Sequence, residues 1–225
     1  MNPVPDPLGE DLPRPRPRLR GVFHQWAFVV SLATGAALVA LAATVRAAVA
    51  AAVFAVAVSA LFGVSALYHR ITWRPAARRW MRRLDHSMIF VLIAGTYTPV
   101  GLLVLRHGLG AAILWVVWSG AVAGIVIKLS WTRAPRWLSV GIYLALGWVA
   151  AVAMPSLASH VGLLGVGLLL GGGLAYSVGA LIYARRRPDP VPAVFGYHEL
   201  FHLLVIVGVL AHMAAIALVL VTPPT

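Results

Sequence analysis

The sequence contains no cysteine, and only 11% of its 225 residues are charged. The absence of cysteine excludes disulfide frameworks, thiolate metal sites and cysteine nucleophiles. Acidic residues are scarce too, with six against eighteen Lys and Arg, which leaves a formal net charge of +12. The chain is 61% hydrophobic, against roughly 45–50% in soluble domains, and this excess indicates a membrane protein.

The apolar residues are gathered into runs of about 20 residues, the length that a helix needs to cross the hydrocarbon core of a bilayer. Seven such runs predict an all-α membrane protein folded as a seven-transmembrane helix bundle. Residues 1–20 are rich in Pro and Arg, and they predict a disordered cytoplasmic tail ahead of a transmembrane domain at 21–225. The expected spans are approximately 23–45, 47–69, 84–105, 109–130, 136–154, 161–183 and 198–221.

Proline and glycine add detail to these spans. Pro99 predicts a kink in the third span, and Pro155 predicts the end of the fifth. The sixth span is rich in glycine, which lets helix backbones approach closely in lipid. We therefore expect the sixth span to be a packing helix.

The positive charges divide unevenly between the two sides of this bundle. Sixteen Lys and Arg fall on the side of the N-terminus, whereas Arg46 and Arg106 fall on the other. The positive-inside rule then places the N-terminus in the cytoplasm and the C-terminus outside. Because the basic residues flank apolar spans, their expected partner is the anionic surface of membrane lipids and not a nucleic acid.

Polar and ionisable residues at membrane depth are costly and are therefore functional candidates. Here they occur where the second span ends and where the third and seventh spans begin, which the topology places at one cytoplasmic boundary. These residues are Ser65, His69, Asp85, His86, His198, Glu199 and His202. Positions far apart in the sequence thus reach the same depth.

His198 and His202 stand four residues apart, so their rings share one helix face, a spacing that suits chelation of one metal ion. His69 adds a third imidazole, with Ser65 one turn deeper in the membrane. Three histidines with an open position form a catalytic zinc shell, so the sequence predicts Zn²⁺ on these three residues. The alternative is that they are interfacial residues that form hydrogen bonds between helices.

The remaining polar residues have open interpretations. Asp85 could cap the start of the third helix, but beside zinc a carboxylate orients a water and accepts its proton, which is the role we favour. His86 points about 100° away from Asp85 on a helix, towards a neighbour or a lipid headgroup. His24 could approach the site, and His212, deeper in the seventh span, is expected to form an interhelical hydrogen bond.

The stretch from His198 to His202 also matches H-E-x-x-H, in which the glutamate, here Glu199, is the general base of a zinc protease. No Asp or Glu follows His202 to supply an acidic third ligand. The third histidine would come from a different helix. An intramembrane metalloprotease is therefore the weaker hypothesis.

Three blocks of the chain resemble the hemolysin III family, bacterial relatives of the adiponectin and progestin receptors and, more distantly, of alkaline ceramidases. They are an S-x-x-x-H motif at 65–69, the run 84–90 leading into 94–99, and an H-x-x-x-H motif at 198–202. The resemblance implies a seven-helix plan and zinc on His69, His198 and His202. It also implies that Asp85 and Ser65 surround the metal-bound water.

The same resemblance implies a protein of membrane-lipid homeostasis in a bacterial plasma membrane, with a zinc-dependent hydrolase of lipid amides or esters as the leading hypothesis. A receptor-like or regulatory protein without turnover is one alternative. A pore-forming cytolysin is another, although no span has the repeated polar face that lines a wide channel.

The topology can be tested by cysteine labelling, because the protein has no native cysteine. Single cysteines at Ala77 and Thr225 lie on opposite sides of the predicted bundle. In intact cells an impermeant thiol reagent should label the Thr225→Cys variant alone, and Ala77→Cys should react after lysis. The reverse labelling pattern would overturn the orientation.

Overall fold

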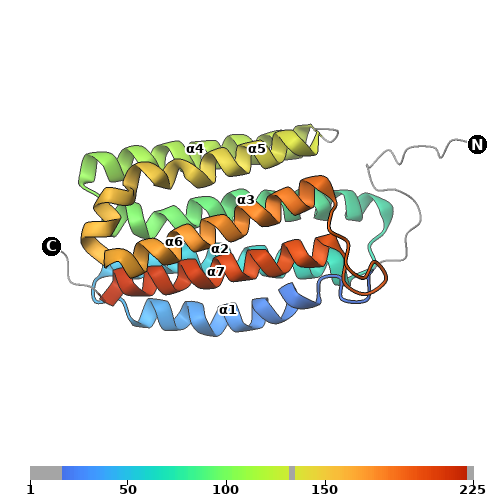
Figure 1. Ribbon diagram of the computed structural model, residues 1–225, viewed down its shortest axis with the longest axis horizontal. Helices are drawn as coiled ribbons and strands as arrows, with labels where there is room; N and C mark the ends of the chain where they lie inside the picture. The colour runs from blue at the N-terminus through green and yellow to red at the C-terminus, as the bar shows by residue number, and fades with distance from the viewer. Residues whose placement is uncertain (1–16, 132–134, 222–225) are drawn as a thin grey trace, which may run out of the picture.

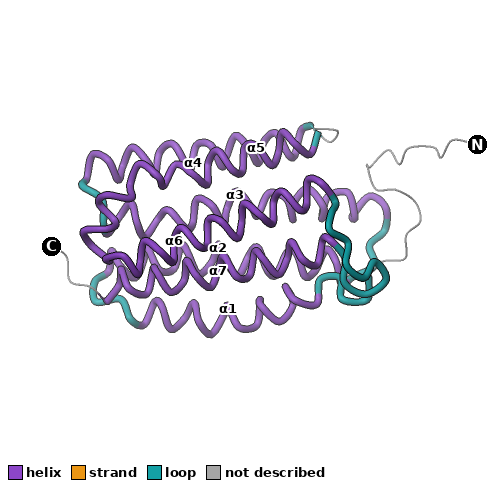
Figure 2. Tube along the Cα trace, in the orientation of Figure 1, coloured by secondary structure: helices purple, strands orange, loops and turns teal. Residues whose placement is uncertain are grey.

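The computed structural model describes residues 17–131 and 135–221, and within them helices are joined by loops (Figures 1 and 2). The helices lie roughly side by side along the long axis of the molecule, with α4 and α5 on one flank and α1 on the other. In chain order they are α1 (Val22–Ala40), α2 (Val45–Arg70), α3 (Pro75–Leu103), α4 (His107–Ser130), α5 (Arg136–Gly147), the 3₁₀ helix η1 (Trp148–Ala153), α6 (Met154–Arg185) and α7 (Tyr197–Val221).

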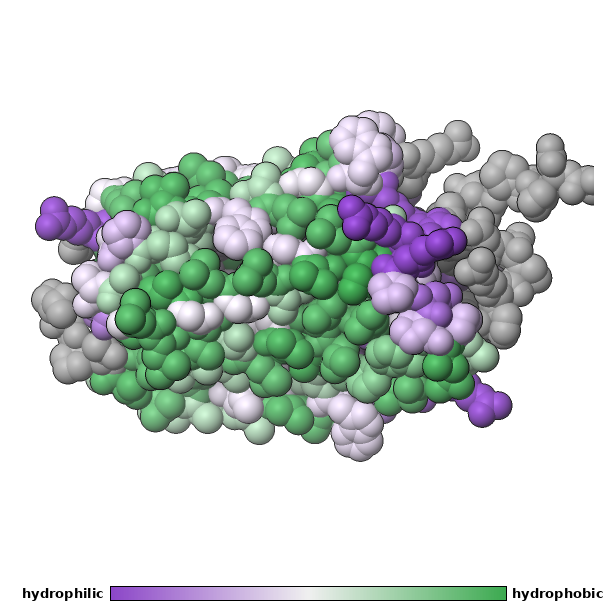
Figure 3. Space-filling view, viewed as in Figure 1, coloured by the Kyte–Doolittle hydropathy of each residue, from purple (hydrophilic) through white to green (hydrophobic). Residues whose placement is uncertain are grey.

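Six helical stretches within the described residues are long and apolar enough to cross a membrane. The stretch at 136–185 counts as one, although it contains α5, η1 and α6. Figure 3 shows a broad hydrophobic surface with hydrophilic residues gathered towards the two ends. The protein is therefore an integral membrane protein, as the composition predicts.

Two helix boundaries differ from the sequence prediction. The third helix begins at Pro75, which occupies its first turn, so most of the expected loop at 70–83 is helical. Apolar length marks the part of a helix that lies in lipid, and it misses turns that extend into the headgroup region. Pro155 does not end the fifth helix but lies in the first turn of α6, a position that proline tolerates because no helical N–H is lost there.

The chain just before α1 is tied to the loop before α7. The backbone N–H groups of Arg18 and Leu19 donate to the carbonyls of Ala193 and Val194, each at 3.1 Å. Gly21 follows with a φ of 76°, and a Cβ there would lie 2.6 Å from the Cβ of His69. Glycine thus allows α1 to begin against the end of α2. Residues 1–16 of the expected tail lie outside the described residues.

Small residues let α6 and α7 pack closely, as the glycine content predicts. A Cβ at Gly172 would lie 2.4 Å from the ring of His212 and 3.1 Å from the carbonyl of Gly208. The Nε2–H of His212 donates to the Leu169 carbonyl at 3.0 Å, which confirms the interhelical hydrogen bond expected for this residue. By contrast, a Cβ at Gly171 would meet nothing within 4 Å.

This packing predicts opposite effects for two neighbouring substitutions. Gly172→Ala should force α6 and α7 apart and lower the free energy of unfolding by about 1–3 kcal/mol, the usual cost of overpacking. Gly171→Ala, on the exposed face, should be neutral or stabilising because alanine favours helix over glycine by about 1 kcal/mol. Thermal melting of both variants in the same detergent measures the difference. Equal melting temperatures would contradict the packing argument.

Candidate metal centre

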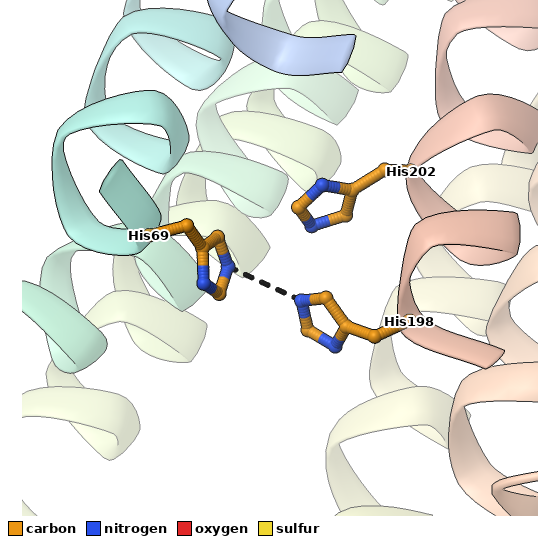
Figure 4. Close-up of side chains that lie close together, drawn as sticks. All are labelled: His69, His198 and His202. Carbon is orange, nitrogen blue, oxygen red and sulfur yellow. Dashed lines mark hydrogen bonds between the residues drawn. The ribbon is translucent and has the colours of Figure 1, made fainter. Parts of the chain in front are cut away.

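His69, His198 and His202 come together between the end of α2 and the start of α7 (Figure 4). One nitrogen from each ring lies within 4.8 Å of the others. The Nε2 atoms of His69 and His198 are 3.1 Å apart. The side chain of His69 is 4% exposed, and His198 and His202 are 7% and 2% exposed. The predicted convergence of the three histidines is therefore confirmed.

The donor set fits a tetrahedral metal ion. Two imidazole nitrogens bound at about 2.0–2.1 Å in a tetrahedron lie about 3.4 Å apart. The separation between His69 and His198 is already close to this value, whereas the widest separation in the group requires a small ring movement. Buried imidazoles of this kind suit a transition-metal ion such as zinc. The cluster could thus hold a metal through one nitrogen of each ring.

Asp85 and Ser65 lie beside the three rings. The Oδ2 of Asp85 is 3.9 Å from the Nε2 of His69, and the carboxylate adjoins the Ser65 hydroxyl. Asp85 stands in the third turn of α3, so it does not cap that helix, and the capping alternative is wrong. The distance of 3.9 Å is too long for a direct hydrogen bond but leaves room for a shared ligand or water.

His24 belongs to the same cluster. Its Nδ1 is 2.9 Å from the Ser65 hydroxyl, and its ring stacks on His202 with centroids 3.8 Å apart. A serine hydroxyl can accept one hydrogen bond and donate another, so Ser65 can bridge His24 and Asp85. The sequence offered His24 only as a candidate at the same membrane side, because its contact with α7 depends on how α1 is anchored.

Arg20 is a site residue that the sequence interpretation assigned only to the basic tail. Its Nε–H donates to the Nδ1 of His69 at 3.3 Å, and the same nitrogen is 3.8 Å from the Oε1 of Glu199. The pairing of Arg18 and Leu19 with the loop before α7 brings it there. A pattern of charges along the chain carries no signal for such a contact.

Glu199 is fully buried and helps to form the first turn of α7. Its Oε2 accepts a hydrogen bond from the N–H of Gly196 at 2.9 Å, the reach that a glutamate three residues into a helix makes in a capping box. Asp189 accepts from the N–H of Tyr197 at 2.8 Å. These contacts fix the turn that carries His198, so Glu199 has a structural task at the start of α7.

His86 contacts neighbouring helices, one of the two alternatives that the sequence left open. Its Nε2 lies 3.3 Å from the hydroxyl of Tyr183, and its carbonyl accepts a hydrogen bond from Tyr143 at 3.1 Å. His86, together with Asp85, Ser65, His198 and His202, lines a cavity that is partly open to solvent.

Comparison with known proteins places this arrangement in a family. A family model described as Haemolysin-III related matches residues 13–213. The chain belongs to the haemolysin-III-related family. The resemblance inferred from the three sequence blocks is thereby confirmed.

Similar proteins come from bacteria and from animals. The chain is 37% identical to Hemolysin-3 of Bacillus cereus over 165 residues, which cover 73% of this chain and 72% of the relative. It is 37% identical to the Hemolysin-3 homolog of Bacillus subtilis (strain 168) over 148 residues, or 66% of each chain. Identity to the human monocyte to macrophage differentiation factor is 25% over 170 residues, or 74% of this chain and 68% of the relative.

The metal site predicts a specific pattern of metal loss. His69→Ala, His198→Ala and His202→Ala should each reduce bound zinc from about one ion per chain to near zero, because two imidazoles cannot close the site. Metal analysis of the purified variants measures this. The control is His160→Ala, which removes a histidine near the opposite end of α6. Full zinc occupancy in the three cluster variants would refute the site.

Proposed function

We propose that this haemolysin-III-related protein is a zinc-dependent hydrolase of lipid amides or esters that acts in membrane-lipid homeostasis. One observation carries the proposal: the three imidazoles lie together, and two of them, His198 and His202, line a cavity with the carboxylate of Asp85 and the hydroxyl of Ser65. A purely structural metal site has four protein ligands and no need of an adjacent cavity. The proposed substrates and partners are membrane lipids.

The residues divide the chemistry among them. His69, His198 and His202 hold the ion, which when bound would polarise a carbonyl oxygen and lower the pKa of a water. Asp85 lies at the distance from His69 at which a carboxylate can hold the attacking water and accept its proton. Ser65 lies beside Asp85 and can donate a hydrogen bond to the oxygen that gains negative charge.

The proposal includes the membrane orientation and the number of crossings. The 50-residue stretch at 136–185 is long enough for two crossings, and Figure 1 draws α5 and α6 running in opposite directions on either side of η1. Seven crossings then separate the sixteen basic residues from Arg46 and Arg106, with the N-terminus and the site on the cytoplasmic side. The bacterial relatives support a plasma membrane location.

A receptor-like protein is the second candidate function. The human relative with 25% identity bears the name of a differentiation factor, which makes no reference to catalysis. A cavity that binds a lipid beside a metal would serve signalling without turnover. The two functions differ only in whether a bound lipid is cleaved, so the test must measure cleavage and zinc together.

Asp85→Asn separates catalysis from binding. If Asp85 accepts the proton of the attacking water, this variant should keep its zinc, and its hydrolysis rate should fall by about 10²–10⁴-fold. Ser65→Ala should keep zinc and lose less. Glu199→Gln, another buried carboxylate beside the site, is the matched control and should retain most of the activity because it serves the helix start.

Zinc analysis and lipid turnover are measured on the same preparations of these variants. Loss of zinc in Asp85→Asn would make the carboxylate a metal ligand and contradict its role towards the water. Unchanged lipid pools in all variants, with zinc retained, would favour the receptor. Loss of activity in Glu199→Gln alone would favour the protease.

A further inference from the structure

The cavity beside the histidine cluster is strongly basic. Its walls are formed by residues of all seven α-helices, and the described residues that line it include one carboxylate, Asp85. The cations that line it are Arg78, Arg79, Arg82, Arg83, Lys128 and Arg136. None of these six residues is needed to hold a metal, so the proposed function does not account for them.

The cations converge from three helices. Arg82 lies in the second turn of α3, Lys128 lies in the last turn of α4, and Arg136 is the first residue of α5. All three interact electrostatically with His86, and Arg82 also interacts with Lys128. Like charges repel at this range, and the repulsion is relieved when an anion lies between them.

Membrane orientation alone does not explain this arrangement. The positive-inside rule requires basic residues at one end of the bundle, but it does not require them to face an interior cavity. Arg74 and Arg185 meet that requirement from exposed positions that do not line the cavity. The six lining cations therefore have a second task.

Several of these cations are held in place by neighbours. The Nζ of Lys128 donates to the hydroxyl of Ser139, and the guanidinium of Arg136 lies 5.9 Å from the ring centroid of Tyr183. Groups that are already oriented lose less conformational freedom when a ligand binds. The cationic wall is thus suited to receive a ligand.

Deeper in the same cavity the wall is apolar. Leu61, Ile89, Val140, Phe201 and Val205 line it near the level of the histidines. A ligand that fills both parts has an anionic head and an apolar chain. A single arginine can bind both oxygens of a carboxylate. A phosphate has three oxygens available and carries more negative charge, so it can contact cations from all three helices at once.

We propose that this cavity binds a phosphate-bearing acyl lipid, with its headgroup on Arg82, Lys128 and Arg136 and its acyl linkage directed towards Asp85 and the histidine cluster. This proposal rests on the proposed function and narrows its substrate class from lipids in general to anionic phospholipids. Hydrolysis of the linkage would add one water and release a carboxylate and the phosphate-bearing alcohol or amine.

Binding of short-chain lipids to the full-length protein in neutral detergent tests the proposal. The probes are dioctanoyl phosphatidic acid, dioctanoyl glycerol, dioctanoyl phosphatidylcholine and inorganic phosphate, read by tryptophan fluorescence because Trp131 lines the cavity. Phosphatidic acid should bind about ten-fold or more tightly than the uncharged or zwitterionic lipid, the scale of one charge-assisted hydrogen bond. Equal affinities would overturn the proposal, and equally tight binding of inorganic phosphate would overturn its lipid part.

Charge-removal variants locate the binding. Arg82→Gln and Lys128→Gln should each weaken phosphatidic acid binding about ten-fold and leave dioctanoyl glycerol unaffected. Arg74→Gln and Arg185→Gln remove the same charge at the same end of the bundle and should bind as the wild type does. Equal losses in all four variants would identify a general surface effect and contradict the cavity site.

Zinc content and lipid cleavage, measured in the same samples, distinguish a failure of the headgroup inference from a failure of the proposed hydrolase. One outcome is that the protein binds zinc and cleaves neutral lipid amides but binds phosphatidic acid no more tightly than dioctanoyl glycerol. In that case the headgroup inference fails and the proposed function stands. If phosphatidic acid binds selectively in protein that binds no zinc and cleaves nothing, the headgroup inference stands and the hydrolase fails.

Discussion

The hydrogen bond between the Nε2 atoms of His69 and His198 joins residues that are 129 positions apart in the sequence. In lipid no hydrophobic driving force acts between helices, so their association depends on close packing and on interhelical hydrogen bonds such as this one. This contact joins the end of α2 to the start of α7. A metal held by both rings would strengthen the same connection, because binding energy of the ion becomes energy of helix association.

The approach of α7 depends on the segments that precede α1 and α7. Backbone hydrogen bonds from Arg18 and Leu19 hold the loop at 193–194, and Glu199 and Gly196 define the first turn of the helix. This turn carries His198, and the next turn carries His202. Ordering of the loop therefore sets the geometry of two of the three imidazoles.

The general plan of the protein and its three histidines could be predicted from the sequence because both depend on local patterns. Apolar run length identifies helices in lipid, and a four-residue spacing places His198 and His202 on one face. The start of α3 was missed because its first turns are rich in arginine and lie beyond the apolar run. The contacts of Arg20 and His24 follow from the anchoring of α1 near Gly21, which is a tertiary event without a local sequence signal.

The contact of Arg20 with His69 bears on how a metal would enter. An arginine Nε can only donate, so the Nδ1 of His69 accepts, and the proton of the neutral ring lies on Nε2, the atom that faces His198. If a metal binds that Nε2, the ring proton must move to Nδ1. The N–H groups of His69 and Arg20 would then face each other, and no hydrogen bond could form between them. The two states exclude each other, and Arg20 needs another acceptor when the metal is bound. The buried Oε1 of Glu199 lies 3.8 Å from the Nε of Arg20 and lacks a hydrogen-bond partner, so a short shift of the guanidinium would give each group a partner.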